Sequence, residues 1–368
     1  MVRPTNASLD ASPAKTGENA AFDLIHVGTL LEFSDLVREL GGDPDDLLRS
    51  VGIDRSNVTR AVTRISFRAM IDLLEKSADR LKCPDFGMRL AVRQGGGKVF
   101  GPMGVVMRNS STLGDALAYV GRHIQAYSLA AGMPMEHDRA AGRVFVGLDI
   151  LLENIADRSQ TVEQHLLLAH YNAVEITAGR ARVRQVRFRH QPLSPLRTYR
   201  DHFGCEVLFE QPSDGIVFSQ DDLNAPIVDP DVQHYEIATS FIEANYPPAS
   251  APMHARVRGL VMKTLGVSDC RIERIADELC MHPRTLHRRL KWEHKSFEDI
   301  KDEVRRDLAR YYLERTSVPF TRISEKLGYS ETSVLSRSCT RWFGHSPRDV
   351  RSRARADPAN DPGPVGAK

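Results

Sequence analysis

The sequence predicts an α+β domain followed by an all-α domain made of two helix-turn-helix units in tandem. Three observations predict this fold class. The last third of the chain repeats a pattern of short helix, break and second helix. Short β-rich runs bounded by glycine, proline and aspartate occupy the middle, after several helical patterns. The charge divides at the same place, because residues 251 to 355 carry 23 Lys and Arg against 14 Asp and Glu, whereas the rest carries 27 against 34.

The composition and the charge distribution limit the classes of protein to which this chain can belong. A chain of 368 residues, 41% hydrophobic and 27% charged, is expected to form two globular domains. A basic domain after an acidic one indicates a polyanionic partner for the basic domain. The polar start lacks the apolar core of a signal peptide, and no apolar run approaches the ~20 residues that cross a bilayer. We therefore expect a cytoplasmic protein that does not bind membranes.

The cysteines are odd in number and scattered along the chain, at Cys83, Cys205, Cys270, Cys280 and Cys339. This distribution argues against a disulfide framework. No pair of them has the spacing of metal ligands, and the neighbours Cys280 and His282 fit a helix break better than a zinc site. We therefore expect reduced cysteines, no metal and no cofactor.

The first elements are predicted to be helices. Apolar spacing predicts a helix from Leu24 to Leu40 that ends at Gly41 and Gly42, and further helices within residues 43–53 and 66–81. Ser66 is placed to cap the last of these. The glycines at 95–97 lack the spacing and the Lys-Ser/Thr ending of a phosphate-binding loop, so we interpret them as a mobile lip of a pocket.

A helix is then expected to begin near Thr112, with Leu113, Leu117, Val120, Ile124 and Tyr127 on its inward side. Four segments have strand patterns, at residues 142–150, 181–191, 205–211 and 215–223. A long helix, near residues 158–178, separates the first strand from the second. We expect an antiparallel sheet covered by that helix.

A pocket is expected where the two helices beginning near Thr112 and Arg158 face the sheet. Apolar and aromatic walls with a few polar groups suit a small organic effector. The candidate lining residues are Met103, Met107, Tyr119, His123, Tyr127 and His165. A lone histidine at such a position is more often a packing residue than a ligand. No nucleophile, metal site or carboxylate pair typical of an enzyme is recognisable.

The first helix-turn-helix unit lies at residues 271–292. Ile272, Ile275, Ala276 and Leu279 share one face of a supporting helix. After a break, Pro283 opens a second helix with Leu286 and Leu290 inward. Its outward face carries Arg284, His287, Arg288 and Lys291. This spacing suits contact with base edges and phosphates in a major groove. An ordinary solvated basic face explains this unit alone equally well.

The second unit repeats the plan with Phe320, Ile323 and Leu327 inward, a break at Gly328 and Ser330 as the expected N-cap. The outward residues of its second helix are Thr332, Ser333, Ser336 and Arg337. A helix at residues 296–316 joins the units. About twenty helical residues span roughly 30 Å, close to the ~34 Å of one DNA turn. The linking helix could therefore hold both outward faces against one side of a duplex.

Residues 256–353 resemble the AraC/XylS family of transcription regulators, whose DNA-binding domain has two helix-turn-helices bridged by a helix. The resemblance is carried by IADEL, PRTLHRRL, ISEKLGYSETSVLSR and RWFGHSPRDVR. It implies base-reading roles for Arg284, His287 and Arg288 and for Thr332, Ser333, Ser336 and Arg337. Leu335, Ser338, Cys339 and Thr340 depart from the family pattern, which puts the second unit's core and phosphate contacts in question.

The N-terminal half resembles, more loosely, the arabinose-binding-like effector domain of a subgroup of that family, in residues 100–117 and 186–218. The Pro-rich stretch 246–252 separates the halves. The expected division is a disordered start at 1–21, an effector-binding or dimerisation domain at 22–245, a linker at 246–255, the double helix-turn-helix domain at 256–353 and a disordered tail at 354–368.

We therefore expect a sequence-specific transcription regulator without enzymatic activity, whose N-terminal domain senses a small molecule, dimerises, or does both. The expected partners are double-stranded promoter DNA, a small organic effector, RNA polymerase and a second copy of the chain. The alternative is a DNA-tethered enzyme similar to alkylation-repair proteins, which needs a metal-activated cysteine. An architectural protein without an effector conflicts with the large acidic N-terminal half.

Overall fold

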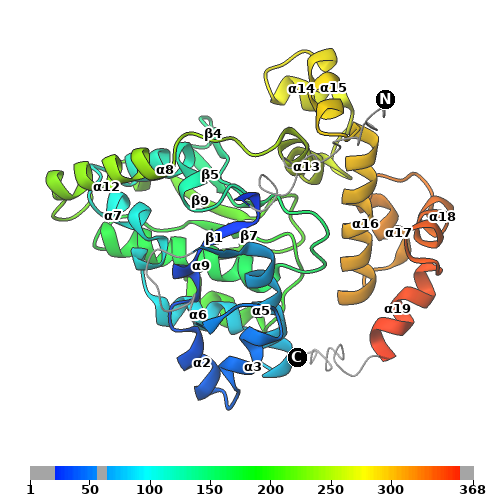
Figure 1. Ribbon diagram of the computed structural model, residues 1–368, viewed down its shortest axis with the longest axis horizontal. Helices are drawn as coiled ribbons and strands as arrows, with labels where there is room; N and C mark the ends of the chain where they lie inside the picture. The colour runs from blue at the N-terminus through cyan, green and yellow to red at the C-terminus, as the bar shows by residue number, and fades with distance from the viewer. Residues whose placement is uncertain (1–20, 56–63, 357–368) are drawn as a thin grey trace, which may run out of the picture.

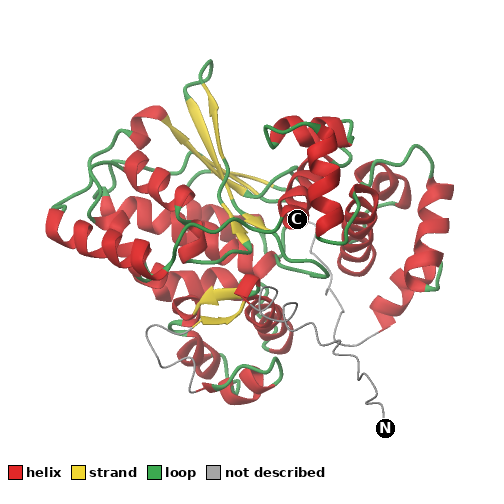
Figure 2. Ribbon diagram, turned by 45° about the horizontal axis from the view of Figure 1, so that its top comes forward, coloured by secondary structure: helices red, strands yellow, loops and turns green. Residues whose placement is uncertain are grey.

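The computed structural model describes residues 21–55 and 64–356. Figure 1 shows an N-terminal α+β domain beside a helical C-terminal domain, and in Figure 2 the described strands all belong to the first of these. The fold class expected from the sequence is confirmed. The start and the tail that were expected to be disordered lie largely outside the described residues. Residues 354–356 are an exception, because they are helical and not part of a tail.

The N-terminal domain begins with short elements: β1 (Leu24–His26), the 3-10 helix η1 (Val27–Leu30), α2 (Phe33–Glu39), α3 (Pro44–Arg49) and β2 (Arg64–Ser66). The expected helix from Leu24 to Leu40 is therefore wrong for its first half. There β1 pairs with β2 in an antiparallel ribbon, and Glu32 has a left-handed backbone with φ 63° that separates η1 from α2. The pairing partner lies about forty residues away, outside any helical window.

Helices surround the rest of the domain. They are α5 (Phe67–Arg80), α6 (Phe86–Gln94), η2 (Gly97–Phe100), α7 (Pro102–Arg108), α8 (Leu113–Arg122), η3 (Ile124–Ala126), α9 (Ser159–Ile176), α10 (Leu196–Phe203), α11 (Gln220–Leu223) and α12 (Val232–Asn245). Ser66 caps α5 as expected, and Thr112, near which a helix was expected to begin, caps α8; each accepts a hydrogen bond from a backbone N–H of the first turn. Gly96 and Gly97 pack closely against Glu175 and Asn172 of α9.

The main sheet has the strand order β4-β5-β9-β7-β8. Its strands are β4 (Met135–Asp138), β5 (Arg143–Gly147), β7 (Gln185–Arg187), β8 (Glu206–Leu208) and β9 (Gly215–Ser219), while β3 (Ala131–Gly132) and β6 (Asp149–Ile150) form a separate pair. The expectation of an antiparallel sheet is wrong at one edge, where β7 and β8 are parallel and α10 connects them. A parallel pair requires such a crossover, because a tight turn can join only antiparallel strands.

The C-terminal domain contains α13 (Met253–Thr264), α14 (Ile272–Glu278), α15 (Pro283–Trp292), α16 (Phe297–Arg315), α17 (Phe320–Lys326), α18 (Thr332–Phe343) and α19 (Pro347–Ala356). It has two small cores, one around α14 and α15 and the other around α17 and α18. The linking helix α16 contributes Ile300 and Val304 to the first core and Ala309 and Leu313 to the second. Both helix-turn-helix units are therefore built onto one helix.

The two domains contact each other through oppositely charged side chains. Each of four ion pairs joins a cation of the C-terminal domain to a carboxylate of the N-terminal domain: Lys263–Glu136, Lys295–Glu153 (3.3 Å), Arg315–Asp79 (3.3 Å) and Lys326–Glu210 (3.4 Å). In addition, the Asn154 N–H donates to the Asp307 carboxylate of α16 at 3.0 Å. The side of α16 turned away from α17 and α18 therefore lies against the N-terminal domain (Figure 1).

Candidate DNA interface and effector pocket

The outward face of α15 is basic and free of the protein core. His282 caps this helix by accepting a hydrogen bond from the Arg284 N–H at 3.2 Å, and Pro283 occupies its first position. Leu286 and Leu290 are buried beneath. The four side chains selected from the sequence are all exposed, namely Arg284, His287, Arg288 and Lys291. Sequence reasoning missed Trp292, which is 71% exposed and whose ring lies 5.4 Å from the Arg288 guanidinium.

The outward face of α18 is exposed as well, but its short side chains are bonded locally. The Ser333 hydroxyl donates to the Glu331 carboxylate at 2.8 Å, and the Ser336 hydroxyl donates to the Thr332 carbonyl at 3.3 Å. Glu331 is the N-cap residue, so the expectation of Ser330 in that position is wrong. The outward residues are Thr332, Ser333, Ser336 and Arg337. Among the described residues, Arg337 has no side-chain partner and can extend into a groove.

The core of the second unit accommodates the residues that depart from the family pattern. Leu335 and Cys339 are fully buried, and Ser338 is buried with its hydroxyl 3.1 Å from that of Tyr329. The small side chains at 338 and 339 bring less apolar area into this core than larger ones would. Arg305 of α16 adds polar contacts at the edge of this core. Its guanidinium stacks 4.6 Å from the Tyr329 ring and donates to the Leu327 carbonyl.

An apolar pocket lies inside the N-terminal domain between α7, α8, α9 and the sheet. It encloses about 960 Å³. Five inward residues expected for the segment after Thr112 line it, which are Leu113, Leu117, Val120, Ile124 and Tyr127. Of the six candidate lining residues, the structure brings together Met103, Met107, Tyr127 and His165. The sequence reasoning missed Ala169, Asn172 and Ala173, which follow His165 at helical spacing on the same face of α9.

Tyr119 and His123 do not line this pocket, so their expected place in it is wrong. Their rings stack on each other at 4.0 Å, and Tyr119 packs edge-on against Tyr235 of α12. Both therefore lie on the side of α8 that faces α12. Burial raises the pKa of the Tyr119 hydroxyl to about 12, with a smaller contribution from Glu243.

The polar end of the pocket is uncharged. Burial lowers the pKa of His165 to about 4, which keeps the ring neutral at physiological pH. Its Nδ1 lies 2.8 Å from the Thr161 carbonyl and therefore carries the proton. Its Nε2 then accepts from the Tyr127 hydroxyl at 2.9 Å. The Thr161 hydroxyl and the Asn172 carbonyl oxygen are buried without a partner among the described residues, so both keep unused hydrogen-bonding capacity.

Comparison with family models identifies both halves. The arabinose-binding domain of AraC transcription regulators matches residues 41–227, and a helix-turn-helix domain matches residues 275–353. The first match covers more than half of the chain. The chain belongs to the AraC family. It is a transcription regulator with an arabinose-binding-type N-terminal domain and a helix-turn-helix DNA-binding domain.

Two relatives matched over nearly their full length support this membership. The HTH-type transcriptional regulator VirS of Mycobacterium tuberculosis is 36% identical over 89% of this chain and 96% of its own length. The ornithine utilization regulator of Pseudomonas aeruginosa is 24% identical over 90% of this chain and 98% of its own. A crystal structure of the transcriptional regulator CdpR from Pseudomonas aeruginosa covers 86% of this chain and 97% of that one, with 19% identity and a TM-score of 0.38.

Three cysteines of this AraC-family protein lack the activation that the alternative of a DNA-tethered enzyme requires. Burial raises the pKa of Cys83 to about 12 and those of Cys205 and Cys339 to about 11, so these three remain thiols. Within residues 21–55 and 64–356, no three His, Cys, Asp or Glu side chains are grouped to hold a metal ion. Nor is any helix in these ranges both long and apolar enough to cross a membrane.

Proposed function

We propose that this AraC-family regulator binds specific promoter sequences through α15 and α18 and that a neutral, mainly apolar effector in the N-terminal pocket controls this binding. The exposed basic face of α15 is the observation that carries the first part. A polar face on α18, attached to the same helix α16, supports it. Two reading helices on one support are suited to successive turns of a major groove, because the support keeps their separation constant.

The chemistry of the pocket indicates the class of effector. Its walls are aliphatic, thioether and aromatic side chains, and the polar groups that line it are neutral: Tyr127, His165, Thr161 and Asn172. An ionised ligand would lose its hydration there without gaining an opposite charge. A compact uncharged molecule with one or two hydrogen-bonding groups is therefore favoured.

The pocket adjoins the contact with the DNA-binding domain. Leu148 and Ile150 line the pocket on one side and the interdomain cavity described below on the other. An effector that displaces this two-sided wall would change the surface against which α16 rests. We infer that effector control acts through the docking of the DNA-binding domain. We also propose that the regulator acts in the cytoplasm, where it meets RNA polymerase, and that it binds DNA as a homodimer.

The DNA part is tested with two arginines of α15. Genome-wide mapping of bound DNA supplies a specific site, which is then titrated beside random DNA. Arg288→Ala is expected to weaken specific binding by about 1–3 kcal/mol more than random binding, because arginine pairs bidentately with guanine. Arg289→Ala is the matched control, since Arg289 is exposed on the same helix outside that face. Equal losses on both DNAs would make Arg288 a phosphate contact only.

The effector part is tested by filling the pocket. Ala169 lines it, so Ala169→Leu reduces its volume, whereas Ala244→Leu adds the same atoms to an exposed position of α12. The neutral fluorophore Nile red serves as the probe, and neutral apolar compounds are screened by its displacement. Affinity is expected to fall about tenfold or more in Ala169→Leu only. Similar affinities in the two variants would place the probe elsewhere and contradict the proposed site.

A further inference from the structure

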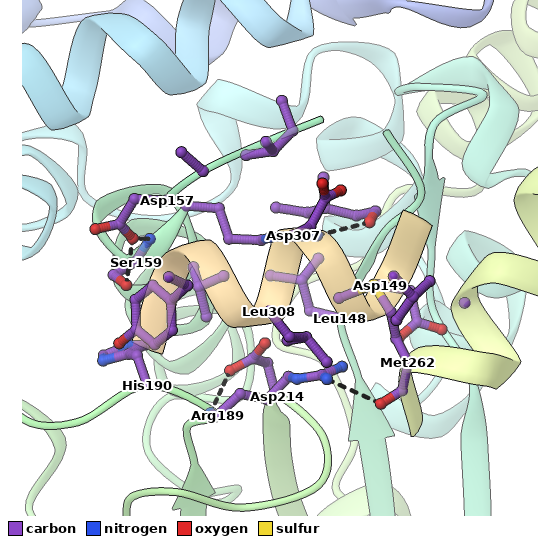
Figure 3. Close-up of a pocket in the computed structure, with 18 of the residues that line it drawn as sticks. Leu148, Asp149, Asp157, Ser159, Arg189, His190, Asp214, Met262, Asp307 and Leu308 are labelled. Atoms are coloured by element: carbon purple, nitrogen blue, oxygen red, sulfur yellow. Dashed lines mark hydrogen bonds between the residues drawn. The ribbon is translucent and has the colours of Figure 1, made fainter. Parts of the chain in front are cut away.

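A second cavity lies between the two domains and differs chemically from the apolar pocket. It encloses about 790 Å³ and is shown in Figure 3, where α16 crosses it. The N-terminal domain lines it with residues 148–150, 155–159, 162, 189, 190 and 214, and the C-terminal domain with α13 and α16. Three arginines reach it from separate segments: Arg158, Arg189 and Arg258.

These arginines are only partly satisfied. Arg258 is 1% exposed and donates to Asp307 through Nη2, but its Nε and Nη1 are buried without a partner among the described residues. Arg158 donates from one nitrogen to the Ile150 carbonyl at 2.9 Å, and Arg189 from one nitrogen to the Met262 carbonyl at 2.9 Å. A guanidinium carries five N–H donors, so all three side chains retain free donors.

The arginines also repel one another. The pKa of Arg158 is lowered to about 10, first by burial and then by the nearby charges of Arg258 and Arg189. Buried like charges raise the free energy of the docked arrangement unless an anion accompanies them. Asp214 and Asp307 oppose this repulsion, and the donors that stay unpaired, above all Nε and Nη1 of Arg258, can bind a further negative charge.

Four carboxylates also line the cavity, at Asp149, Asp157, Asp214 and Asp307, and each has partners of its own or a raised pKa. Asp307 is shared by Arg258, Arg306 and the Asn154 N–H. Asp157 accepts from the Ser159 backbone N–H and hydroxyl and lies 3.7 Å from the Arg315 guanidinium, and Asp214 accepts from the backbone N–H of Arg189. Burial raises the pKa of Asp149 to about 6, so this side chain can keep its proton beside a bound anion.

The remaining walls are apolar, with Leu148, Ile150, Ile155, Val162, Leu308 and Met262 among them. An inorganic anion would leave these walls without a partner, whereas an organic anion would cover them. We propose that this interdomain cavity binds a small organic carboxylate, whose anionic group contacts Arg158 and Arg189 of the N-terminal domain and Arg258 of the C-terminal domain. Such a ligand joins the two domains and stabilises their docked arrangement.

The role of this ligand is separate from that of the apolar effector, because the two cavities share only the wall of Leu148 and Ile150. The carboxylate holds α16 against the N-terminal domain and so acts as a co-regulator. Failure of either proposal leaves the other intact, since Ala169→Leu changes only the apolar pocket and the arginine variants change only the interdomain cavity.

The experiment uses the full-length protein and follows its thermal unfolding in acetate, succinate, citrate, benzoate and inorganic phosphate at matched ionic strength. At least one carboxylate is expected to raise the Tm saturably, and calorimetric titration of that compound to give one site per chain. Arg158→Gln is expected to reduce its affinity about tenfold or more. Arg197→Gln, which alters an exposed arginine of α10, is the matched control and is expected to bind normally.

Three outcomes would overturn the proposal. They are the absence of a saturable response to every carboxylate, equal affinities in Arg158→Gln and Arg197→Gln, and a response to phosphate alone. A second readout keeps the test valid if Arg158→Gln unfolds. In that case Asp149→Asn, which removes a cavity carboxyl that would repel the anion when ionised, is expected to tighten carboxylate binding. Unchanged or weaker binding in Asp149→Asn would also contradict the proposal.

Discussion

Replacing Asp307 with asparagine is expected to destabilise the DNA-binding domain strongly, because it leaves the buried Arg258 without its counter-charge. The two side chains are 8% and 1% exposed, respectively. Breaking a buried pair by removing one partner costs about 3–5 kcal/mol, since the remaining charge stays out of water. The asparagine keeps the size of the side chain and one acceptor oxygen. The expected loss therefore reports charge and not a cavity.

Equilibrium urea unfolding provides the assay. Both tryptophans of the chain, Trp292 and Trp342, lie in the C-terminal domain, so their fluorescence follows this domain. The matched control is Glu325→Gln, which breaks an ion pair with Arg322 in which both side chains are more than half exposed. Exposed pairs contribute about 0–1 kcal/mol. The buffer contains no carboxylate, so that no anion can substitute for Asp307.

A loss below about 1 kcal/mol for Asp307→Asn would refute this reasoning. It would mean that water already solvates Arg258 through the cavity and that the ion pair is energetically equivalent to a surface pair. A large loss of unfolding free energy in both variants would show instead that the domain is destabilised by the removal of any carboxylate, whether buried or exposed.

Three further predictions follow from the same structure. Burial raises the pKa of Glu163 to about 8 from an ordinary 4.5, so its contribution to stability is complete below pH 4.5 and is lost as the pH rises through 8. In urea unfolding, the Glu163→Gln variant should therefore lose less unfolding free energy between about pH 6.5 and 8 than the unchanged protein. An equal loss in both proteins would assign the pH dependence to another group. Base substitutions should weaken binding by about 1–3 kcal/mol per base pair in the half-site proposed for α15 and by clearly less in the half-site proposed for α18. Quantitative footprinting measures these losses, and equal losses in the two half-sites would contradict the asymmetry. Residues 251–368 alone should bind DNA in gel-shift titrations without a response to metabolites. A metabolite response of this fragment would place the effector site in the C-terminal domain and contradict the proposed N-terminal site.

The helix-turn-helix units could be predicted from sequence because local spacing determines them. The positions of Leu286, Leu290 and Leu335 follow from helical periodicity, and Pro283 marks its own helix start. The failures concern contacts between distant segments. The strand β1 has apolar spacing that also fits a helix, and only its pairing with β2 decides its conformation. Likewise, nothing local reveals that β7 and β8 run parallel.

In the candidate pocket, too, features set by local sequence were predicted and contacts between distant segments were missed. Met103, Met107, Tyr127 and His165 were predicted as apolar, aromatic and polar lining where the two expected helices face the sheet, and all four line the apolar pocket. Tyr119 was misplaced because α8 is covered on two sides, by the pocket and by α12, and spacing alone does not distinguish these sides. The interdomain cavity was missed entirely, because its arginines come from three segments that only the tertiary fold brings together.

The position of α16 has an evolutionary consequence. This one helix sets the separation of the two reading helices and also presents Asp307, Tyr311 and Arg315 to the N-terminal domain. One inserted residue would rotate everything beyond it by about 100° and advance it by about 1.5 Å. Such a change would turn α18 relative to α15 and separate the interdomain contacts in the same step. Lineages descended from this protein are therefore expected to diversify their operators by substitutions on α15 and α18, with the length of α16 held constant.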